Sequence, residues 1–382
     1  MNLKASFIAI IASGVVATPL MAETEVETKG GIEATSGDFS FEFGGRIQLD
    51  FNTFDEDGTE MQDGFEFRRA RLFAAGTLYS DWDYKAQYDF AGDAVEAKDL
   101  YIKYTGWDAG DITIGQFKQP FSLEELTSSK YITFMERALP NAFATGRRVG
   151  VGYNTADDNS TFAASFYGQS ADESTAGDEG FGLGARYTFL PMKSENSLFH
   201  LGAAVAVEEA PDSATESVRF RQRMEAHMAE RLVNTGSITS VDSITKVGVE
   251  GAWVSGPLSI QGEYIMADVA RDIGSDVSFD GYYAFASYFL DGQTSRPYKK
   301  GSFGRVKASD VWELGLRLSS INLDDVSNGV NGGEMIDITL GANYYVNPNL
   351  RFMFNYVMSE VSSNGVTVEE PNAFVVRASF DF

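Results

Sequence analysis

The chain has 382 residues, 30 basic and 55 acidic side chains, a formal net charge of −25 and no cysteine. The absence of cysteine excludes a disulfide-stapled module and a thiolate zinc site, and two histidines leave little room for a histidine-rich metal centre or a Ser-His-Asp hydrolase. The acidic balance argues against nucleic acid as a partner, and a mean hydropathy of −0.18 excludes a bundle of transmembrane helices.

The N-terminus carries the features of a secretory signal peptide over residues 1–22. Lys4 gives a positive start, residues 7–16 form an apolar run, and Ala22 is a small residue before Glu23. The run is too short to cross a bilayer as a permanent helix. We therefore predict export with cleavage within a residue or two of Ala22; the alternative is a buried N-terminal helix. The Glu-, Thr- and Gly-rich residues 23–38 predict a flexible lead-in.

From Phe39 to the C-terminus, runs of seven to twelve residues alternate strictly between apolar and polar side chains. Period-2 alternation of this length predicts strands with one apolar and one polar face. Tight linkers such as 347–349 alternate with long acidic linkers such as 362–372, as in membrane barrels. Residues 39–382 therefore predict an all-β, closed, antiparallel transmembrane barrel of about 16 strands with an aqueous interior. The alternative is a soluble β-sandwich.

Residues 119–148 break the alternation between two predicted strands. Leu123, Leu126 and Lys130 have helical spacing, and Ser122 with Glu125 has capping-box spacing. The mixed apolar and polar content favours a loop folded into the lumen as a constriction, because such a loop must pack against the wall. The alternative is a plain outer loop with one helical turn.

Three arginines alternate along a predicted strand from Glu216 to His227: Arg219, Arg221 and Arg223. Residues two apart on a strand are separated by about 6.6 Å, so the fields of neighbouring guanidiniums overlap. Arginine binds phosphate in bidentate fashion and keeps its proton. The pattern therefore predicts an anion ladder on the lumen face; the alternative is a set of ordinary lumen charges paired with carboxylates.

A second basic group surrounds the non-alternating segment, and the same alternative applies to it. Its members are Arg46, Arg68, Arg69, Arg71, Lys118, Arg147 and Arg148. The remaining motifs are weak. Gly150-Val151-Gly152 has no following helix and is not a phosphate-binding loop, and the acidic residues 55–58 are typical of a solvated loop. We predict no catalytic residue, metal site or cofactor.

From Gly44 to Phe382 the chain resembles the phosphate-selective porin O/P family of Gram-negative outer membranes. The resemblance is carried, in order, by the segments 44–50, 67–72, 115–118, 126–130, 135–141, 146–150, 217–223, 253–258, 288–292, 296–298 and 347–351. It implies a 16-stranded barrel in outer-membrane lipid, a homotrimer, and an inward loop that forms the constriction. It also implies that phosphate descends an arginine ladder to a narrow site rich in Arg, Lys and Ser.

Carried over residue by residue, the ladder resembles Arg219, Arg221 and Arg223. The full constriction set that we predict is Arg46, Arg68, Arg69, Arg71, Lys118, Glu125, Ser128, Ser129, Lys130, Arg147 and Arg148. Phe382 resembles the terminal signal read by the barrel-assembly machinery. Glu125 is a departure, because phosphate-selective members have a lysine at this place, and a carboxylate there would repel phosphate.

The predicted function is a passive outer-membrane porin biased to anions such as phosphate or polyphosphate, without enzymatic activity. The alternative within the class is a general, weakly selective diffusion porin, which Glu125 and the acidic balance favour. Less favoured are an outer-membrane barrel enzyme and a structural or adhesive barrel with a closed lumen.

Overall fold

A computed structural model describes residues 25–27, 31–173, 178–210 and 217–382 of the chain. The predicted signal peptide, residues 1–22, lies outside the described residues. Within the described ranges, no helix combines the length and the apolar character needed to span a membrane.

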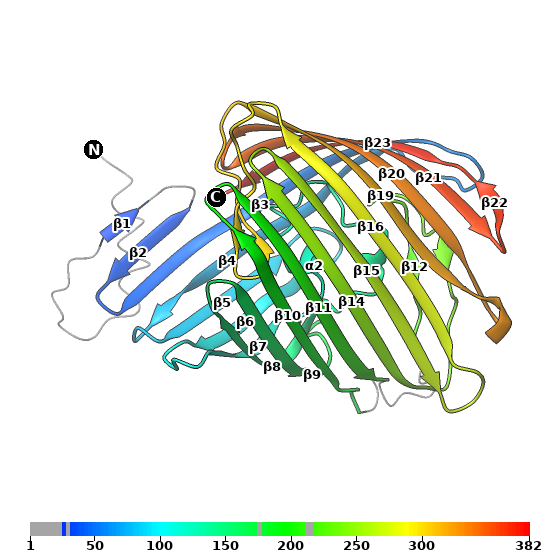
Figure 1. Cartoon of the computed structure of the whole chain (residues 1–382), viewed down its shortest axis with the longest axis horizontal. Coiled ribbons are helices and arrows are strands. Elements are labelled where there is room, and N and C mark those ends of the chain that lie inside the picture. The colour runs from blue at the N-terminus through cyan, green and yellow to red at the C-terminus, as the bar shows by residue number, and fades with distance from the viewer. Residues whose placement is uncertain (1–24, 28–30, 174–177, 211–216) are drawn as a thin grey trace.

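The main body is a closed barrel of 16 antiparallel strands (Figure 1). Each strand pairs with its neighbours in sequence, and β23 pairs with β3 to close the ring, from Asn372 opposite Asp55 to Asp381 opposite Arg46. The strands are β3 (Phe39–Asp55), β4 (Gly64–Leu78), β5 (Trp82–Asp89), β6 (Glu96–Tyr104), β7 (Asp111–Lys118), β8 (Arg147–Ala156), β9 (Ser160–Tyr167), β10 (Gly182–Lys193), β11 (Ser197–Glu209), β14 (Val241–Ser255), β15 (Leu258–Arg271), β16 (Val277–Phe289), β19 (Val311–Asp325), β20 (Val330–Asn347), β21 (Leu350–Ser363) and β23 (Asn372–Asp381).

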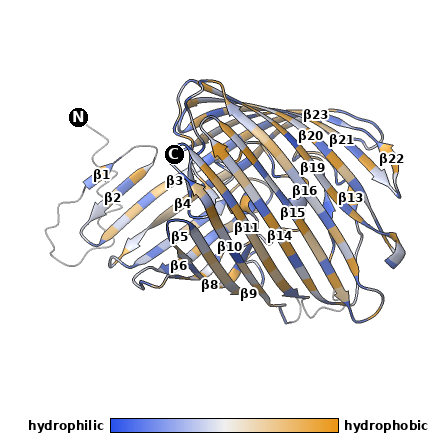
Figure 2. Ribbon diagram, in the orientation of Figure 1, coloured by the Kyte–Doolittle hydropathy of each residue, from blue (hydrophilic) through white to orange (hydrophobic). Residues whose placement is uncertain are grey.

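The alternation in the sequence becomes the two faces of the barrel wall. On β3, Ile47 and Leu49 are exposed on the outside, whereas Gln48 and Asp50 are buried in the interior. The strands in Figure 2 carry the same mixture of apolar and polar bands along their length. A closed barrel leaves no unpaired strand edge, so its apolar outer face can contact lipid without exposing backbone polar groups. The predicted fold class is confirmed.

The connections differ at the two ends of the barrel. Residues 79–81, 157–159 and 194–196 form tight turns at one end, whereas 119–146 and 210–240 are long connections at the other. One segment departs from this rule: residues 290–310 connect β16 to β19 at the tight-turn end. The sequence pattern did not single this segment out.

Three connections fold into the barrel and pack against its wall or against one another. Residues 119–146 contain α2 (Leu123–Leu126) and the 3-10 helix η1 (Leu139–Ala142). The second, from 217 to 240, contains β12 (Arg221–Gln222) and β13 (Val233–Asn234). The third, 290–310, contains β17 (Tyr298–Lys299) and β18 (Ser302–Phe303). We call them the first, second and third inward segments.

The inward segments have their own apolar core inside the lumen. Phe121 and Phe143 of the first segment and Phe220 and Met224 of the second are buried in one cluster. The ring centroids of Phe143 and Phe220 are 5.4 Å apart in an edge-to-face arrangement, which is a favourable geometry for aromatic pairs. Residues 119–146 therefore fold inward, whereas Arg147 and Arg148, the last two residues of the predicted segment, begin β8.

The N-terminal region contains a hairpin that extends from the barrel (Figure 1). Strand β1 (Glu25–Glu27) pairs with β2 (Ile32–Ser36), and β2 pairs with the first residues of β3. These residues therefore lie in strands, and the flexible lead-in predicted over 23–38 is wrong for them. At the opposite end, β22 (Val366–Glu369) pairs with the end of β21, and η2 (Val326–Asn328) follows β19.

The C-terminal residue closes the seam of the barrel. The Phe382 amide donates to the Gly45 carbonyl at 3.1 Å, and the Gly45 amide donates to the Phe382 carbonyl at 2.8 Å. A Cβ on Gly44 would lie 2.4 Å from the Phe382 oxygen. Glycine is therefore required at this position, because the first strand of the barrel approaches the C-terminal residue closely.

Candidate functional site

The first inward segment is held by contacts along its whole length. Its helix α2 begins as the capping-box spacing predicts: the Glu125 amide donates to Ser122 Oγ at 3.1 Å. The Glu263 carboxylate on β15 accepts from the amides of Leu123 and Glu124 at 3.1 and 2.7 Å. Beyond α2, Arg351 on β21 donates to the Ile132 carbonyl at 3.0 Å. The segment is a fixed part of the interior.

Glu125, the departure from the family pattern, is buried and ion-paired. Its carboxylate lies 3.3 Å from Lys118 Nζ and 3.2 Å from Arg137 Nε. Burial alone would raise the pKa of the Glu125 carboxyl. The charges of Arg137 and Lys118 outweigh this effect and lower the pKa to about 2. The carboxylate is thus ionised at neutral pH and neutralised by its partners, and the group of three carries one net positive charge. Arg137 was absent from the predicted site.

Most of the predicted constriction cations are paired with carboxylates. Each of the following lies within ion-pair distance of the acid named: Arg68 with Glu136 at 2.8 Å, Arg69 with Glu136 at 3.8 Å, Arg71 with Asp89 at 2.6 Å, Lys130 with Asp381 at 3.6 Å, Arg147 with Asp99 at 2.6 Å and Arg148 with Glu173 at 3.9 Å. For these residues, the geometry is that of the alternative prediction, ordinary lumen charges paired with carboxylates.

Arg46 differs from the rest of this set, because no carboxylate of the described residues lies within ion-pair distance of it. Its guanidinium donates to Ser129 Oγ at 2.6 Å, and Gln48 donates to the Ser129 carbonyl at 3.4 Å. The neighbouring Ser128 Oγ accepts from the Lys130 amide at 3.4 Å. Arg46 therefore contacts Ser129 directly, whereas the Ser128 side chain has its hydrogen bond with the Lys130 amide.

The predicted strand from Glu216 to His227 is wrong. Only Arg221–Gln222 form a strand there, paired with β13 inside the barrel, and residues 211–216 lie outside the described residues. The alternation has a different cause: Phe220 and Met224 pack into the lumen core, while Arg219 and Arg221 on the other parity are exposed. Period-2 alternation identifies two faces of an extended chain, but it does not tell lipid from a packed inner loop.

The second inward segment nevertheless gathers arginines. Arg219 Nε donates to Asn234 Oδ1 at 2.8 Å, and a fourth arginine, Arg231, donates to the Arg221 carbonyl at 3.1 Å. Burial together with the charges of Arg223 and Arg221 lowers the pKa of Arg231 to about 10, because like charges lie close together. We call Arg219, Arg221, Arg223 and Arg231 the arginine cluster. Among the residues that the structure describes, no carboxylate lies within ion-pair distance of any of the four.

The arginine cluster continues into the predicted constriction. Burial lowers the pKa of Arg223, and the charge of Arg68 on β4 lowers it further, whereas Glu136 opposes the shift. Contacts place Arg223 beside the same strand: it donates to the His227 carbonyl, and His227 Nδ1 lies 2.7 Å from Glu66, two residues before Arg68 on β4. The two basic groups, which are far apart in the sequence, therefore lie close together in the lumen. Arg231 carried no sequence signal, because only the hairpin of β12 and β13 returns it to Arg221.

The third inward segment contacts the first from the tight-turn end. Arg296 donates to the Tyr131 carbonyl at 2.8 Å and is ion-paired with Glu313, and the Phe303 amide donates to Thr127 Oγ1 at 3.3 Å. Three of its lysines, at 299, 300 and 307, are exposed. This inward segment was not predicted from the sequence, because its turn residues resemble those of an ordinary connection.

Arg317 on β19 joins two of the inward segments to the wall. It is fully buried and ion-paired with Glu124 of the first segment, at 3.2 Å, and with Glu225 of the second. The Glu225 amide in turn donates to Asp337 on β20 at 2.8 Å. The arginine cluster is thus carried on a segment that is anchored by buried charges.

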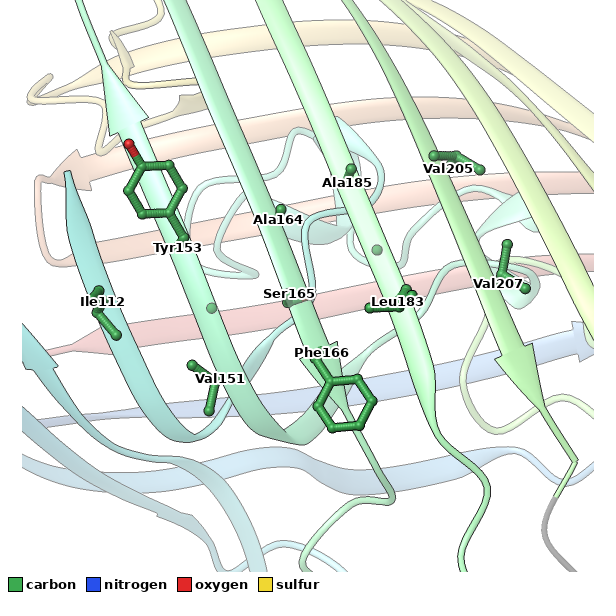
Figure 3. A pocket seen from close by; sticks show the side chains of 12 residues that line it. Ile112, Val151, Tyr153, Ala164, Ser165, Phe166, Leu183, Ala185, Val205 and Val207 are labelled. Carbon is green, nitrogen blue, oxygen red and sulfur yellow. The ribbon is translucent and has the colours of Figure 1, made fainter. Parts of the chain in front are cut away.

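A concavity on the barrel lies apart from these residues. Figure 3 shows it on the wall formed by β7 to β11, lined by side chains such as Val151, Phe166 and Leu183. All three are exposed on the outer face. Its apolar lining is that of a lipid-facing surface, so we do not include it in the site.

A closed 16-stranded barrel with an apolar outer face, a polar interior and segments folded into the lumen defines an outer-membrane porin. Residues 41–382 match the family described as "Phosphate-selective porin O and P", and the chain belongs to this family. It is therefore a protein of the Gram-negative outer membrane.

Relatives and solved structures agree with this assignment. Porin O of Pseudomonas aeruginosa is 29% identical, over 94% of this chain and 93% of that protein. An uncharacterized protein of Caulobacter vibrioides is 32% identical, over 96% of this chain and 79% of that protein. The anion-selective porin from Comamonas acidovorans shares the fold with a TM-score of 0.57 at 14% identity, over 90% of this chain and 100% of its own. OmpT of Vibrio cholerae in its trimer form has a TM-score of 0.58 at 12% identity, over 90% of this chain and 99% of its own.

Proposed function

We propose that the chain forms a passive aqueous channel that prefers anions, with phosphate or polyphosphate as the favoured solute. The observation that carries this proposal is the contrast between two groups of arginines. Those of the barrel wall are mostly paired with carboxylates, whereas the arginine cluster has no such partner among the described residues. Guanidiniums without a carboxylate partner are available to an oxyanion in the lumen.

The path that we propose starts at the arginine cluster. An oxyanion binds a guanidinium in bidentate fashion, and arginine stays charged at every physiological pH. Arginines two residues apart in an extended segment are about 6.6 Å apart, so an anion passes from one to the next without losing its favourable field. Conduction requires several weak sites rather than one tight site, which such a series provides.

The lower part of the path is the group around the first inward segment. Arg223 leads to Arg68 on β4. Arg46 on β3, opposite Arg71, lies nearer the tight-turn end and contacts Ser129 of the first inward segment. We propose that Ser128 and Ser129 donate hydroxyl hydrogen bonds to the anion as it loses water. The remaining predicted cations, whose carboxylates are close, set the background potential of the lumen.

A second candidate is a general diffusion porin with weak selectivity. Glu125 favours it, because this carboxylate stands where phosphate-selective relatives have a lysine. Its ion pairs with Lys118 and Arg137 weaken the objection, since the three side chains together are positive. The absence of a repelling free carboxylate at this point supports the anion channel over the unselective one.

We also propose a homotrimer, recognition of Phe382 by the barrel-assembly machinery, and no catalysis. The trimer is supported by the trimer form of Vibrio cholerae OmpT, which shares the fold. The absence of enzymatic activity is supported by membership of a porin family. Cross-linking in native membranes tests the trimer directly.

The test of the channel is the reversal potential of the purified protein in planar lipid bilayers across a potassium chloride gradient. We expect chloride to be favoured over potassium, and added phosphate to reduce the chloride current by competition. A preference for potassium would overturn the anion channel. A folded barrel without conductance would favour the structural or enzymatic alternatives.

A further inference from the structure

Glu136 of the first inward segment lies at a point where three arginines of the barrel wall meet. Its carboxylate accepts from Arg68 Nε and Nη2, both at 2.8 Å, and from Arg377 Nη2 at 2.7 Å. Arg69 Nη1 lies 3.8 Å from the same carboxylate. A carboxylate held by two nitrogens of one guanidinium and flanked by two more reproduces the way arginines hold a phosphate oxyanion.

The site has more guanidiniums than carboxylates, and one of its hydrogen-bond donors has no partner among the described residues. Arg377 is also held by Asp50, at 2.6 Å, so three guanidiniums face two carboxylates and one positive charge remains. Arg69 is 4% exposed, and its Nε has no hydrogen-bond partner among the described residues. A buried donor without a partner costs free energy, so a ligand oxygen that accepts a hydrogen bond from Arg69 Nε would remove this cost.

The site is also open to the lumen on one side. The side chains of Arg68 and Glu136 are 19% and 15% exposed, whereas Arg377 is fully buried. Arg223 of the arginine cluster donates to the His227 carbonyl, and His227 Nδ1 lies 2.7 Å from the carboxylate of Glu66 on β4, two residues before Arg68. An anion that leaves the arginine cluster therefore meets this site next.

We propose that Glu136 is an internal competitor for the transported anion: its carboxylate occupies the oxyanion site formed by Arg68, Arg69 and Arg377, and it thereby sets how tightly phosphate is held during passage. The proposal rests on the anion channel proposed above and names the residue that determines its affinity. A phosphate that enters the site binds Arg68 beside the Glu136 carboxylate or displaces that carboxylate from Arg68. Because the resident carboxylate is tethered, the site is refilled when the phosphate leaves, and release is fast.

The experiment measures single-channel conductance as a function of inorganic phosphate concentration, for the wild type and for Glu136→Gln. The substitution keeps the shape of the side chain and removes its charge, which leaves two net positive charges at the site. We expect the half-saturating phosphate concentration to fall by about tenfold, the order of magnitude for removing one nearby like charge in a partly hydrated site. The maximal phosphate conductance falls with it, because release becomes slower.

Two variants serve as controls. Glu195→Gln removes the same charge from an exposed turn after β10, and Glu136→Asp keeps the charge in the site. Glu195→Gln should leave the half-saturating concentration within about twofold of the wild type, whereas Glu136→Asp, which keeps the charge but withdraws it by one methylene, should give a smaller fall than Glu136→Gln. An unchanged half-saturating concentration in folded Glu136→Gln overturns the proposal, as does an equal shift in either control.

If Glu136→Gln fails to form barrels, Arg68→Gln takes its place. This change removes the guanidinium that the anion shares with Glu136, and we expect the half-saturating phosphate concentration to rise by about tenfold; no rise overturns the proposal. The reversal potential of the wild type separates the two levels. Potassium selectivity there rejects the anion channel itself, whereas chloride selectivity with no shift in the variants rejects only the role of Glu136.

Discussion

Arg221→Glu is the most direct test of the arginine cluster. Arg221 is exposed on the second inward segment and, among the described residues, no carboxylate lies within ion-pair distance of it. Its replacement changes the local charge by two units without removing a buried contact, because the apolar anchor of the segment is the neighbouring Phe220. We therefore expect the barrel to fold and the change to act on ions alone.

The size of the effect follows from distance and screening. An anion at Arg223 lies roughly 7 Å from position 221 along the extended chain. Two unit charges at that distance interact by about 0.6 kcal/mol in water, and salt at 0.1 M reduces this about twofold. A change of two charges then costs the anion about 0.6 kcal/mol and favours a cation equally. The ratio of chloride to potassium permeability should fall by about eightfold.

The assay is the reversal potential across a potassium chloride gradient centred on 0.1 M. Repeating it near 1 M salt should remove most of the difference, because the screening length is then about 3 Å. Lys193→Glu, which makes the same charge change at the tight-turn end of β10, is the matched control. An unchanged permeability ratio for Arg221→Glu, or an equal change for Lys193→Glu, would show that the arginine cluster does not select the ion.

Three further changes have distinct outcomes. Glu125→Gln leaves Lys118 and Arg137 without their carboxylate, so the preference for chloride should rise about threefold or more. In the wild type, the pKa of Glu125 is about 2, so the ionised carboxylate contributes its full stabilisation of the folded protein above pH 5. This contribution is lost as the pH falls toward 2, which thermal unfolding at several pH values will detect. Arg317→Met strands two buried carboxylates and should cost about 3–5 kcal/mol of stability, seen as a lower denaturation midpoint. Deletion of Phe382 removes the two hydrogen bonds at the seam and should cost about 1–3 kcal/mol in the same measurement. Unchanged midpoints for the last two would refute their anchoring roles.

The barrel itself could be predicted from the sequence. Lipid and water are two distinct environments, so a strand between them must alternate, as Ile47 and Leu49 do with Gln48 and Asp50 on β3. The failure at residues 216–227 has the same origin. Phe220 is as apolar as a lipid-facing residue, but its partner is Phe143 of another inward segment. Pattern alone does not identify what covers an apolar face.

The site was only partly predictable, because its chemistry depends on pairs from distant parts of the chain. Arg68 and Glu136 are 68 positions apart in sequence and are brought together only when the first inward segment enters the barrel. Glu125 looked like a repelling charge until Arg137 and Lys118 were placed beside it. Arg231 could not be found from spacing, since a hairpin of two-residue strands returns it to Arg221.

The origin of the inward segments at both ends of the barrel has a mechanical consequence. The first segment is bound from above by Gln222 of the second, which donates to the Leu139 carbonyl at 3.0 Å, and from below by Arg296 of the third. A segment that is held from one end of the barrel only can move when that attachment breaks, whereas a segment that is held from both ends keeps its position. The narrow zone should therefore keep one aperture under an applied voltage, and the rate of transport should follow the solute's fit to fixed charges rather than the motion of a gate.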